Sequence, residues 1–132
     1  MNQDQTTVIV IDDEDLFRDL LCRQLSGQPE IRVIGDFASA APALASISDL
    51  RPDVAVLDIS LGSGINGVQL GLKLRTALPH LGIVLLSNVV DPSLLLTVPK
   101  AALAGWLYLH KSSIRQIRTL VQAIVQTRQP VK

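Results

Sequence analysis

The chain has 132 residues, 48% of them hydrophobic, which is enough for one well-packed domain and too short for two ordinary ones. Its 12 basic and 12 acidic residues cancel, so the composition gives no broad positive field that would hold a nucleic acid or an anionic membrane surface. The sequence lacks a secretory signal and any apolar run near the roughly 18 to 20 residues of a membrane span. The single cysteine, Cys22, cannot form an internal disulfide, and we therefore expect a cytoplasmic protein that makes no membrane contact.

The first third of the chain predicts two strands, each followed by a helix. Residues 8–11 are continuously apolar, which is typical of a strand buried on both faces of a parallel sheet. The next helix ends at Gly27 and Pro29, and its expected apolar face is formed by Leu16, Phe17, Leu20, Leu21 and Leu25. A short strand over residues 31–35 precedes a helix that Ser39 can cap, with Pro42 in its first turn. The inward residues of that helix are expected to be Leu44, Ile47 and Leu50.

The middle of the chain repeats this alternation. Residues 54–57 form a buried strand that ends on Asp58, and a glycine-rich loop follows. The segment after the loop is ambiguous, since its apolar residues alternate as in a strand: Val68, Leu70, Leu72 and Leu74. Its position between two predicted strands favours a helix. Residues 82–86 form a fourth strand that ends at Ser87.

The last third predicts one more strand between two helices. A helix can begin at Pro92, but Pro99 lacks an amide proton and should break or shorten it. Residues 103–109 form the fifth strand, and a final helix can be capped by Ser112 or Ser113. The residues that this helix should point toward the core are Ile114, Ile117, Val121, Ile124 and Val125. We expect one domain over residues 1–128 and a tail or the start of a linker over residues 129–132.

Strands that alternate with helices predict the fold class. We expect an α/β fold with a doubly wound, five-stranded parallel sheet in the order 2-1-3-4-5, with helices on both faces and right-handed crossovers. In such sheets, ligands bind beyond the carboxyl ends of the strands, where the strand order reverses. The residues that follow the central strands are therefore the candidates for function.

Polar residues follow four of these strands: Asp12 and Asp13, Asp58, Ser87 and Lys111. Carboxylates gathered at one edge would repel one another and raise each other's pKa unless a cation lay between them. Magnesium prefers such oxygen ligands and commonly binds one or two carboxylates together with phosphate. Lys111 and Ser87 would suit a phosphoryl group, and an aspartate such as Asp58 can accept one as an acyl phosphate. Taken singly, the same residues also fit a helix cap, two turn residues and a surface charge.

The arrangement resembles the receiver domain of two-component response regulators, the CheY-like fold, over most of the chain from Val8 to about Val125. The stretches DISLGSGINGVQL and IVLLSNVVDP are similar to receivers of the NarL/LuxR type of transcription regulator. The resemblance implies that a sensor histidine kinase phosphorylates Asp58. It implies that Asp12 and Asp13 are the acidic pair, that Asp13, Asp58 and the Ser60 carbonyl bind Mg²⁺, and that Asp12 acts through water. It also implies that Lys111 is the invariant lysine, Ser87 the switch hydroxyl and Tyr108 the switch aromatic.

The sequence departs from the family pattern at several positions. Gly62 stands where many relatives have proline, and Asn66 with Gly67 makes the loop after Asp58 one residue longer. Asn88 is bulkier than the usual small residue after the switch hydroxyl. Leu107 replaces the common glycine before the switch aromatic, and Pro99 falls in the expected fourth helix.

Three functions remain open at this point. The leading one is a signalling receiver that is not an enzyme with a diffusible substrate and assists only its own phosphorylation and dephosphorylation. The second is a pseudo-receiver that binds partners without phosphorylation, which Asn88 and Pro99 motivate. The third is an aspartate-nucleophile phosphatase of the haloacid dehalogenase kind, although that chemistry usually needs an Asp-x-Asp pair and a cap domain.

Partners beyond the kinase follow from the resemblance. We expect a possible homodimer, formed through the first and fifth helices or the fourth-helix face, and DNA contact only through an output domain that this chain does not contain. Trp106 is expected to be a packing residue, and His80 and His110 are expected to be exposed and incidental because they lack the spacing of metal ligands.

Overall fold

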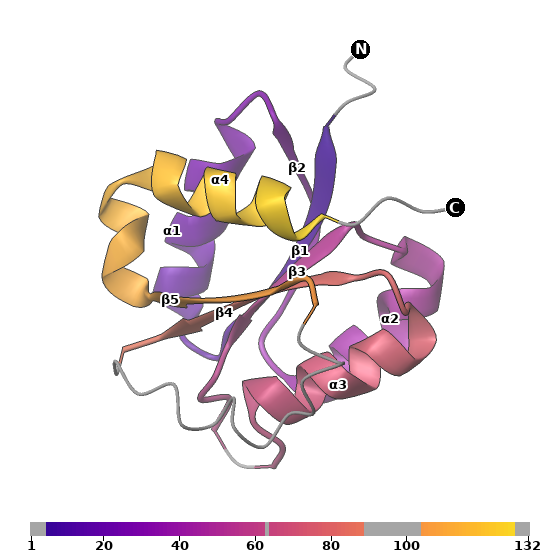
Figure 1. Cartoon of the computed structure of the whole chain (residues 1–132). Helices are drawn as coiled ribbons and strands as arrows, with labels where there is room; N and C mark the ends of the chain where they lie inside the picture. Colours follow the sequence, from indigo (N-terminus) through magenta and orange to yellow (C-terminus); the bar gives the residue numbers. More distant parts are fainter. Residues whose placement is uncertain (1–4, 63, 89–103, 129–132) are drawn as a thin grey trace.

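The computed structural model describes residues 5–62, 64–88 and 104–128. The expected helix around Pro92 and Pro99 and the tail over residues 129–132 lie outside the described residues. Within the described part, strands and helices alternate along the chain (Figure 1).

The sheet has five parallel strands in the order β2-β1-β3-β4-β5, which confirms the predicted fold class. Its strands are β1 (Thr6–Ile11), β2 (Ile31–Phe37), β3 (Val54–Asp58), β4 (Gly82–Ser87) and β5 (Trp106–His110). The central strands are buried on both faces, as their continuous apolar sequence predicts. Side chains of β1 alternate between two cores, with Ile9 and Ile11 on one face and Val8 and Val10 on the other.

Helices cover both faces of the sheet: α1 (Asp15–Ser26), α2 (Ala40–Leu50), α3 (Gly67–Ala77), the 3₁₀ helix η3 (Lys111–Arg115) and α4 (Ile117–Thr127). In Figure 1, α2 and α3 lie on one face, and α1 and α4 lie on the other. These helices pack on the faces of the sheet, and the site forms at the carboxyl ends of its strands. Helix α4 corresponds to the fifth helix expected from the sequence.

Helix α1 buries a narrower face than predicted. Leu21 and Leu25 are buried and Phe17 packs against the core, but Leu16 is 89% exposed and Leu20 is 47% exposed. At about 100° per residue the predicted apolar residues span an arc of about 180°, wider than the stripe one sheet face can cover. The prediction that Leu16 and Leu20 face the core is therefore wrong.

The final helix begins later than predicted. The chain first forms η3, so α4 begins at Ile117 and its N-cap position is Gln116 instead of Ser112 or Ser113. Val121 and Ile124 are buried as expected. Val125 is 44% exposed and lies at the edge of the buried stripe, which corrects its assignment to the core.

The ambiguous segment after the glycine-rich loop is a helix, as its context predicted. Asn66 caps α3: its side chain accepts a hydrogen bond from the Gln69 N–H at 2.8 Å, and the Gln69 side chain accepts one from the Asn66 N–H at 2.9 Å. This reciprocal capping box satisfies two amide groups that the first turn of a helix leaves unpaired. The same position in α2 is taken by Ser39, but its side chain makes no capping hydrogen bond.

Two further expectations concern the thiol and the membrane. Cys22 is half-buried in α1, and burial raises the pKa of its thiol to about 11, so it stays protonated near neutral pH. Across residues 5–62, 64–88 and 104–128, no helix is long and apolar enough to cross a bilayer.

Candidate functional site: an acidic pocket around Lys111

Three of the predicted site residues meet at the carboxyl edge of the sheet. Asp12 follows β1, Asp58 is the last residue of β3, and Lys111 follows β5. All three are buried, with relative exposures of 2%, 5% and 5%. Charged side chains are rarely so buried unless they are paired, which marks this edge as a functional site candidate.

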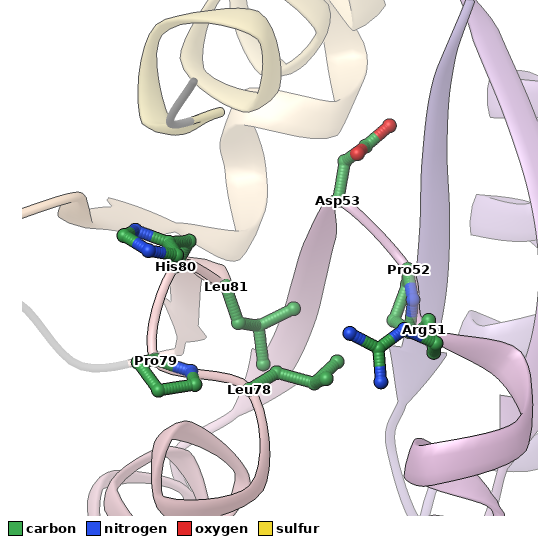
Figure 2. A pocket seen from close by; sticks show the side chains of 7 residues that line it. All are labelled: Arg51, Pro52, Asp53, Leu78, Pro79, His80 and Leu81. Atoms are coloured by element: carbon green, nitrogen blue, oxygen red, sulfur yellow. The ribbon is translucent and has the colours of Figure 1, made fainter. Parts of the chain in front are cut away.

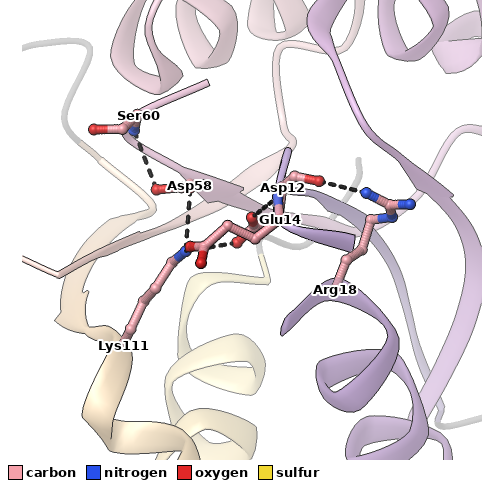
Figure 3. A network of polar contacts seen from close by, with 6 residues as sticks. All are labelled: Asp12, Glu14, Arg18, Asp58, Ser60 and Lys111. Atoms are coloured by element: carbon pink, nitrogen blue, oxygen red, sulfur yellow. Dashed lines mark hydrogen bonds and ion pairs between the residues drawn. The ribbon is translucent and has the colours of Figure 1, made fainter. Parts of the chain in front are cut away.

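The Lys111 ammonium group lies among three carboxylates (Figure 3). Its Nζ is 3.0 Å from Asp12 Oδ2, 3.2 Å from Asp58 Oδ2 and 2.5 Å from Glu14 Oε1. It also lies 4.4 Å from the centre of the Phe17 ring, whose face attracts a cation. Glu14 was absent from the residues predicted for the site, and its place directly after the acidic pair is the signal that could have suggested it.

Asp12 is held in place by several bonds. Its Oδ1 accepts a hydrogen bond from the Glu14 N–H at 2.8 Å, and its backbone carbonyl accepts one from Arg18 at 2.7 Å. Arg18 also pairs with Asp36 at 3.0 Å, which ties α1 to the end of β2. These contacts fix the Asp12 carboxylate against the pocket, since moving it would break bonds in a buried setting.

Asp58 has one oxygen toward Lys111 and the other toward the following loop, where Oδ1 accepts a hydrogen bond from the Ser60 N–H at 3.1 Å. Burial, helped by the nearby Asp12 carboxylate, raises the pKa of Asp58 to about 6, although Lys111 and the Ser60 N–H oppose the shift. Burial alone would lower the pKa of Lys111, but hydrogen bonds to Glu14 and Asp12 and the charges of Asp12 and Asp58 outweigh it and raise that pKa. The lysine is therefore charged at neutral pH.

The carboxylates fit a hard divalent cation. Asp12, Glu14 and Asp58 each offer an oxygen, and these oxygens lie within 4.8 Å of one another. Three carboxylates around one ammonium group leave an excess of negative charge when all are ionised, which a cation such as Mg²⁺ would balance. Asp13 lies outside this group: it is exposed, and its carboxylate faces Gly62 in the loop after β3.

The predicted switch residues, Ser87 and Tyr108, lie on β4 and on the neighbouring edge strand β5. Ser87 is the last residue of β4 and is 8% exposed, and Tyr108 is half-buried in β5 and packs against the core on the α2 and α3 face. Trp106 is 9% exposed and stacks beside Arg75, so it is a packing residue as expected. The movement of Ser87 and Tyr108 on phosphorylation stays a prediction.

His110 is not incidental. Its Nδ1 accepts a hydrogen bond from the Ser112 N–H at 3.1 Å and lies 2.8 Å from the Ser112 hydroxyl, so the proton sits on Nε2, which donates to the Asn88 carbonyl at 2.8 Å. Asn88 follows Ser87, and Ser112 follows Lys111. The His110 imidazole therefore links the backbone next to Ser87 with the backbone next to Lys111. Exposed His80 has no such link in the structure as described.

A cavity of about 220 Å³ lies at the opposite edge of the sheet (Figure 2). It is lined by Arg51, Pro52, Asp53, Leu78, Pro79, His80 and Leu81. Its carboxylate, Asp53, accepts hydrogen bonds from the Thr7 N–H at 2.9 Å and the Thr7 hydroxyl at 3.1 Å. None of the predicted site residues reaches this cavity, so it is separate from the acidic pocket.

Fold and site together define a doubly wound domain with an aspartate, a lysine and an acidic pocket at the carboxyl edge of its sheet. The chain belongs to the response regulator receiver domain family, whose model matches residues 8–124. It is a receiver domain of the kind that two-component signal transduction uses.

Curated relatives are response regulators. The chain is 34% identical over 99 residues to the DNA-binding transcriptional activator DevR/DosR of Mycobacterium tuberculosis, covering 75% of this chain and 45% of that protein. It is 30% identical over 107 residues to the transcriptional regulatory protein DegU of Brevibacillus brevis, covering 81% of this chain and 45% of that protein. The chain thus spans less than half the length of these relatives.

Solved structures of response regulator domains have the same fold as this chain. The receiver domain of the putative response regulator NarL from Mycobacterium tuberculosis superposes with a TM-score of 0.75 at 28% identity, covering 92% of this chain and 98% of that one. The response regulator domain of Thermotoga maritima CheB gives 0.78 at 23% identity, covering 96% of this chain and 99% of that one, and shows the fold alone.

Proposed function

We propose that Asp58 accepts a phosphoryl group from the phosphohistidine of a sensor histidine kinase. The observation that carries this proposal is the buried Asp58 carboxylate 3.2 Å from the buried Lys111 ammonium group, at the edge of the sheet where ligands bind. A structural ion pair alone is a weak reason to bury two charges, because their desolvation offsets much of their attraction. A reaction that needs both groups accounts for their burial.

The transfer uses the ionised carboxylate of Asp58 as nucleophile. An Asp58 oxygen attacks phosphorus, the bond from phosphorus to the kinase imidazole nitrogen breaks, and its electron pair returns to the imidazole. Lys111 lies close enough to neutralise a phosphoryl oxygen as charge moves onto it. The domain would thereby modify itself once per cycle and would turn over no diffusible substrate.

A magnesium ion would be held by Asp12, Asp13, Asp58 and the Ser60 carbonyl and would neutralise phosphoryl oxygens during transfer. The described carboxylates of Asp12 and Asp58 support this assignment, and Glu14 is a further oxygen donor beside them. Asp13, exposed at the rim, would have to turn inward.

Ser87 and Tyr108 would carry the signal outward. We propose that the Ser87 hydroxyl turns toward the phosphoryl oxygens and that Tyr108 rotates inward on the same event. The positions of Ser87 at the end of β4 and of Tyr108 in the neighbouring β5 support this proposal. The output surface would include β5 and the helices beside it.

Phosphotransfer tests the assignment. Acetyl phosphate with Mg²⁺, or a cognate kinase, should add one phosphoryl group to the wild type and none to Asp58→Asn, as read by intact mass. Asp49→Asn, which removes an exposed carboxylate of α2, serves as the matched control and should label normally. Equal labelling of Asp58→Asn and the wild type would contradict the assignment.

We also propose that this receiver controls transcription through an attached output domain and acts as a homodimer. The matched parts make up 45% of relatives that are DNA-binding or transcriptional regulators by name, and this supports the first point. The exposed side chains of Leu16 on α1 and Val125 on the adjacent α4 support the second. Sedimentation with and without phosphorylation tests it: a monomer in both states would contradict it.

A further inference from the structure

Lys111 has no donor to spare among the carboxylates around it. An ammonium group has three N–H donors, and the three carboxylates of Asp12, Glu14 and Asp58 lie within 3.2 Å of its nitrogen. If Asp58 is phosphorylated as proposed above, Lys111 must give one of these contacts to a phosphoryl oxygen. The structure indicates which carboxylate can leave.

Asp12 is the least able to move. Its side chain is 2% exposed, its second oxygen holds the Glu14 N–H, and its carbonyl is bound by Arg18. Asp58 is itself the phosphoryl acceptor and cannot withdraw. Releasing a buried carboxylate without a new partner carries the full desolvation penalty of that group.

Glu14 differs from both in its exposure. Its side chain is 54% exposed, while the lysine that it contacts is 5% exposed, and it lies at the mouth of the pocket just before α1. When released, its carboxylate can be hydrated at little cost. It also makes the shortest of the three contacts to Nζ, at 2.5 Å.

We propose that Glu14 is a latch that holds Lys111 in the unphosphorylated domain and competes with the phosphoryl group for its ammonium group. This inference rests on the proposed function of Asp58. The negative charge at the pocket mouth also opposes the approach of an anionic phosphodonor. Glu14 therefore slows phosphorylation of Asp58, and it is a positioning residue that acts through Lys111.

The test compares Glu14→Gln with Asp15→Asn. The first variant keeps the shape of the side chain and removes its charge; the second removes the adjacent carboxylate, which is 81% exposed and pairs with Arg18 instead of Lys111. Autophosphorylation by acetyl phosphate is measured by intact mass, at Mg²⁺ concentrations raised until the rate no longer increases. This separates the latch from any loss of cation affinity.

We expect Glu14→Gln to be phosphorylated about three to five times faster than the wild type, the size typical of a partly exposed ion pair. Asp15→Asn should stay near the wild-type rate. A Glu14→Gln rate equal to or below that of the wild type, or an equal gain in Asp15→Asn, would overturn the latch.

A second readout needs neither Mg²⁺ nor phosphorylation. The ε-methylene resonance of Lys111, observed by NMR in chelator, should shift in Glu14→Gln and stay in place in Asp15→Asn; an unmoved resonance in Glu14→Gln would also overturn the latch. If the wild type takes no phosphoryl group at all, the proposed function fails and the latch fails with it. If the wild type labels and Glu14→Gln brings no gain, the latch alone fails.

Discussion

Gly67, the first residue of α3, lies so close to Asp58 that a β-carbon on it would fall well inside van der Waals contact of the Asp58 carbonyl oxygen. The Gly67 N–H donates a hydrogen bond to the Ile59 carbonyl at 2.8 Å, which fixes the start of α3 against the end of β3. The glycine of the longer loop is thus required by a close approach of two backbones, next to the residue we propose is phosphorylated.

Gly67→Ala should destabilise the domain by about 1 to 3 kcal/mol, because the added methyl group forces apart two backbone segments that cannot both relax. Urea unfolding measures this change. Gly27→Ala is the control: a β-carbon there would meet its nearest atom at an ordinary 3.6 Å, so we expect a change below about 1 kcal/mol. If both variants unfold at the same urea concentration, the close approach is not a constraint.

Asp58→Asn should stabilise the metal-free domain at neutral pH more than at acid pH. The folded-state pKa of Asp58 is raised from 3.8 to about 6, so the folded protein binds this proton more tightly than the unfolded chain. The stabilisation that this bound proton gives to the folded state is fully present below about pH 4 and is lost as the pH rises through about 6. At pH 8 the buried ionised carboxylate then costs on the order of 2 kcal/mol.

Urea unfolding of the wild type and Asp58→Asn in chelator, at pH 5 and at pH 8, checks this dependence. The advantage of the variant should be larger at pH 8, and added Mg²⁺ should reduce it. A constant difference between the variant and the wild type, or a larger one at pH 5, would show that Asp58 titrates normally.

Lys111→Met should unfold more easily in chelator, by about 3 to 5 kcal/mol, because it leaves Asp12 and Asp58 buried without their shared cation. Mg²⁺ should recover part of this loss, since a divalent ion can replace the missing charge. Lys73→Met, at an exposed position of α3, should stay within about 0.5 kcal/mol of the wild type. A Lys111→Met domain as stable as that control would mean that the carboxylates need no cation.

His110→Ala should loosen the chain on both sides of the pocket. The Ser112 N–H, which donates to the imidazole, should exchange with solvent faster, and stability should fall by about 1 to 2 kcal/mol. Amide exchange by NMR reports the first effect directly. The change should be absent in His80→Ala, and an unchanged Ser112 exchange rate in His110→Ala would contradict the link.

Much of the fold could be predicted because the central strands are buried on both faces. Their β-branched runs, such as residues 8–11, leave little choice of structure, and the strand ends bring Asp12, Asp58 and Lys111 to one edge. The segment after the loop was ambiguous because Gly71, which is buried on the inner face of α3, has no apolar side chain to reveal the helical spacing. The Asn66 and Gln69 capping box was readable in the sequence and would have resolved the ambiguity.

The remaining errors arise from contacts between distant residues. Ser112 was predicted as a cap of the last helix, but its N–H and hydroxyl interact with His110 instead. The His110 ring also contacts the Asn88 carbonyl, and sequence spacing does not show such a contact. The exposure of Leu16 depends on how wide a stripe the sheet covers, which local spacing does not show. The Glu14 side chain contacts the site through Lys111, which lies 97 positions further along the chain.

The most direct measurement locates the phosphoryl group itself. The phosphorylated domain is reduced with borohydride, which converts an aspartyl phosphate to homoserine, and its peptides are sequenced by tandem mass spectrometry. The account predicts homoserine at position 58, and none there when Lys111 is replaced by methionine. Homoserine at Asp12 or Asp13 with Asp58 intact would contradict it.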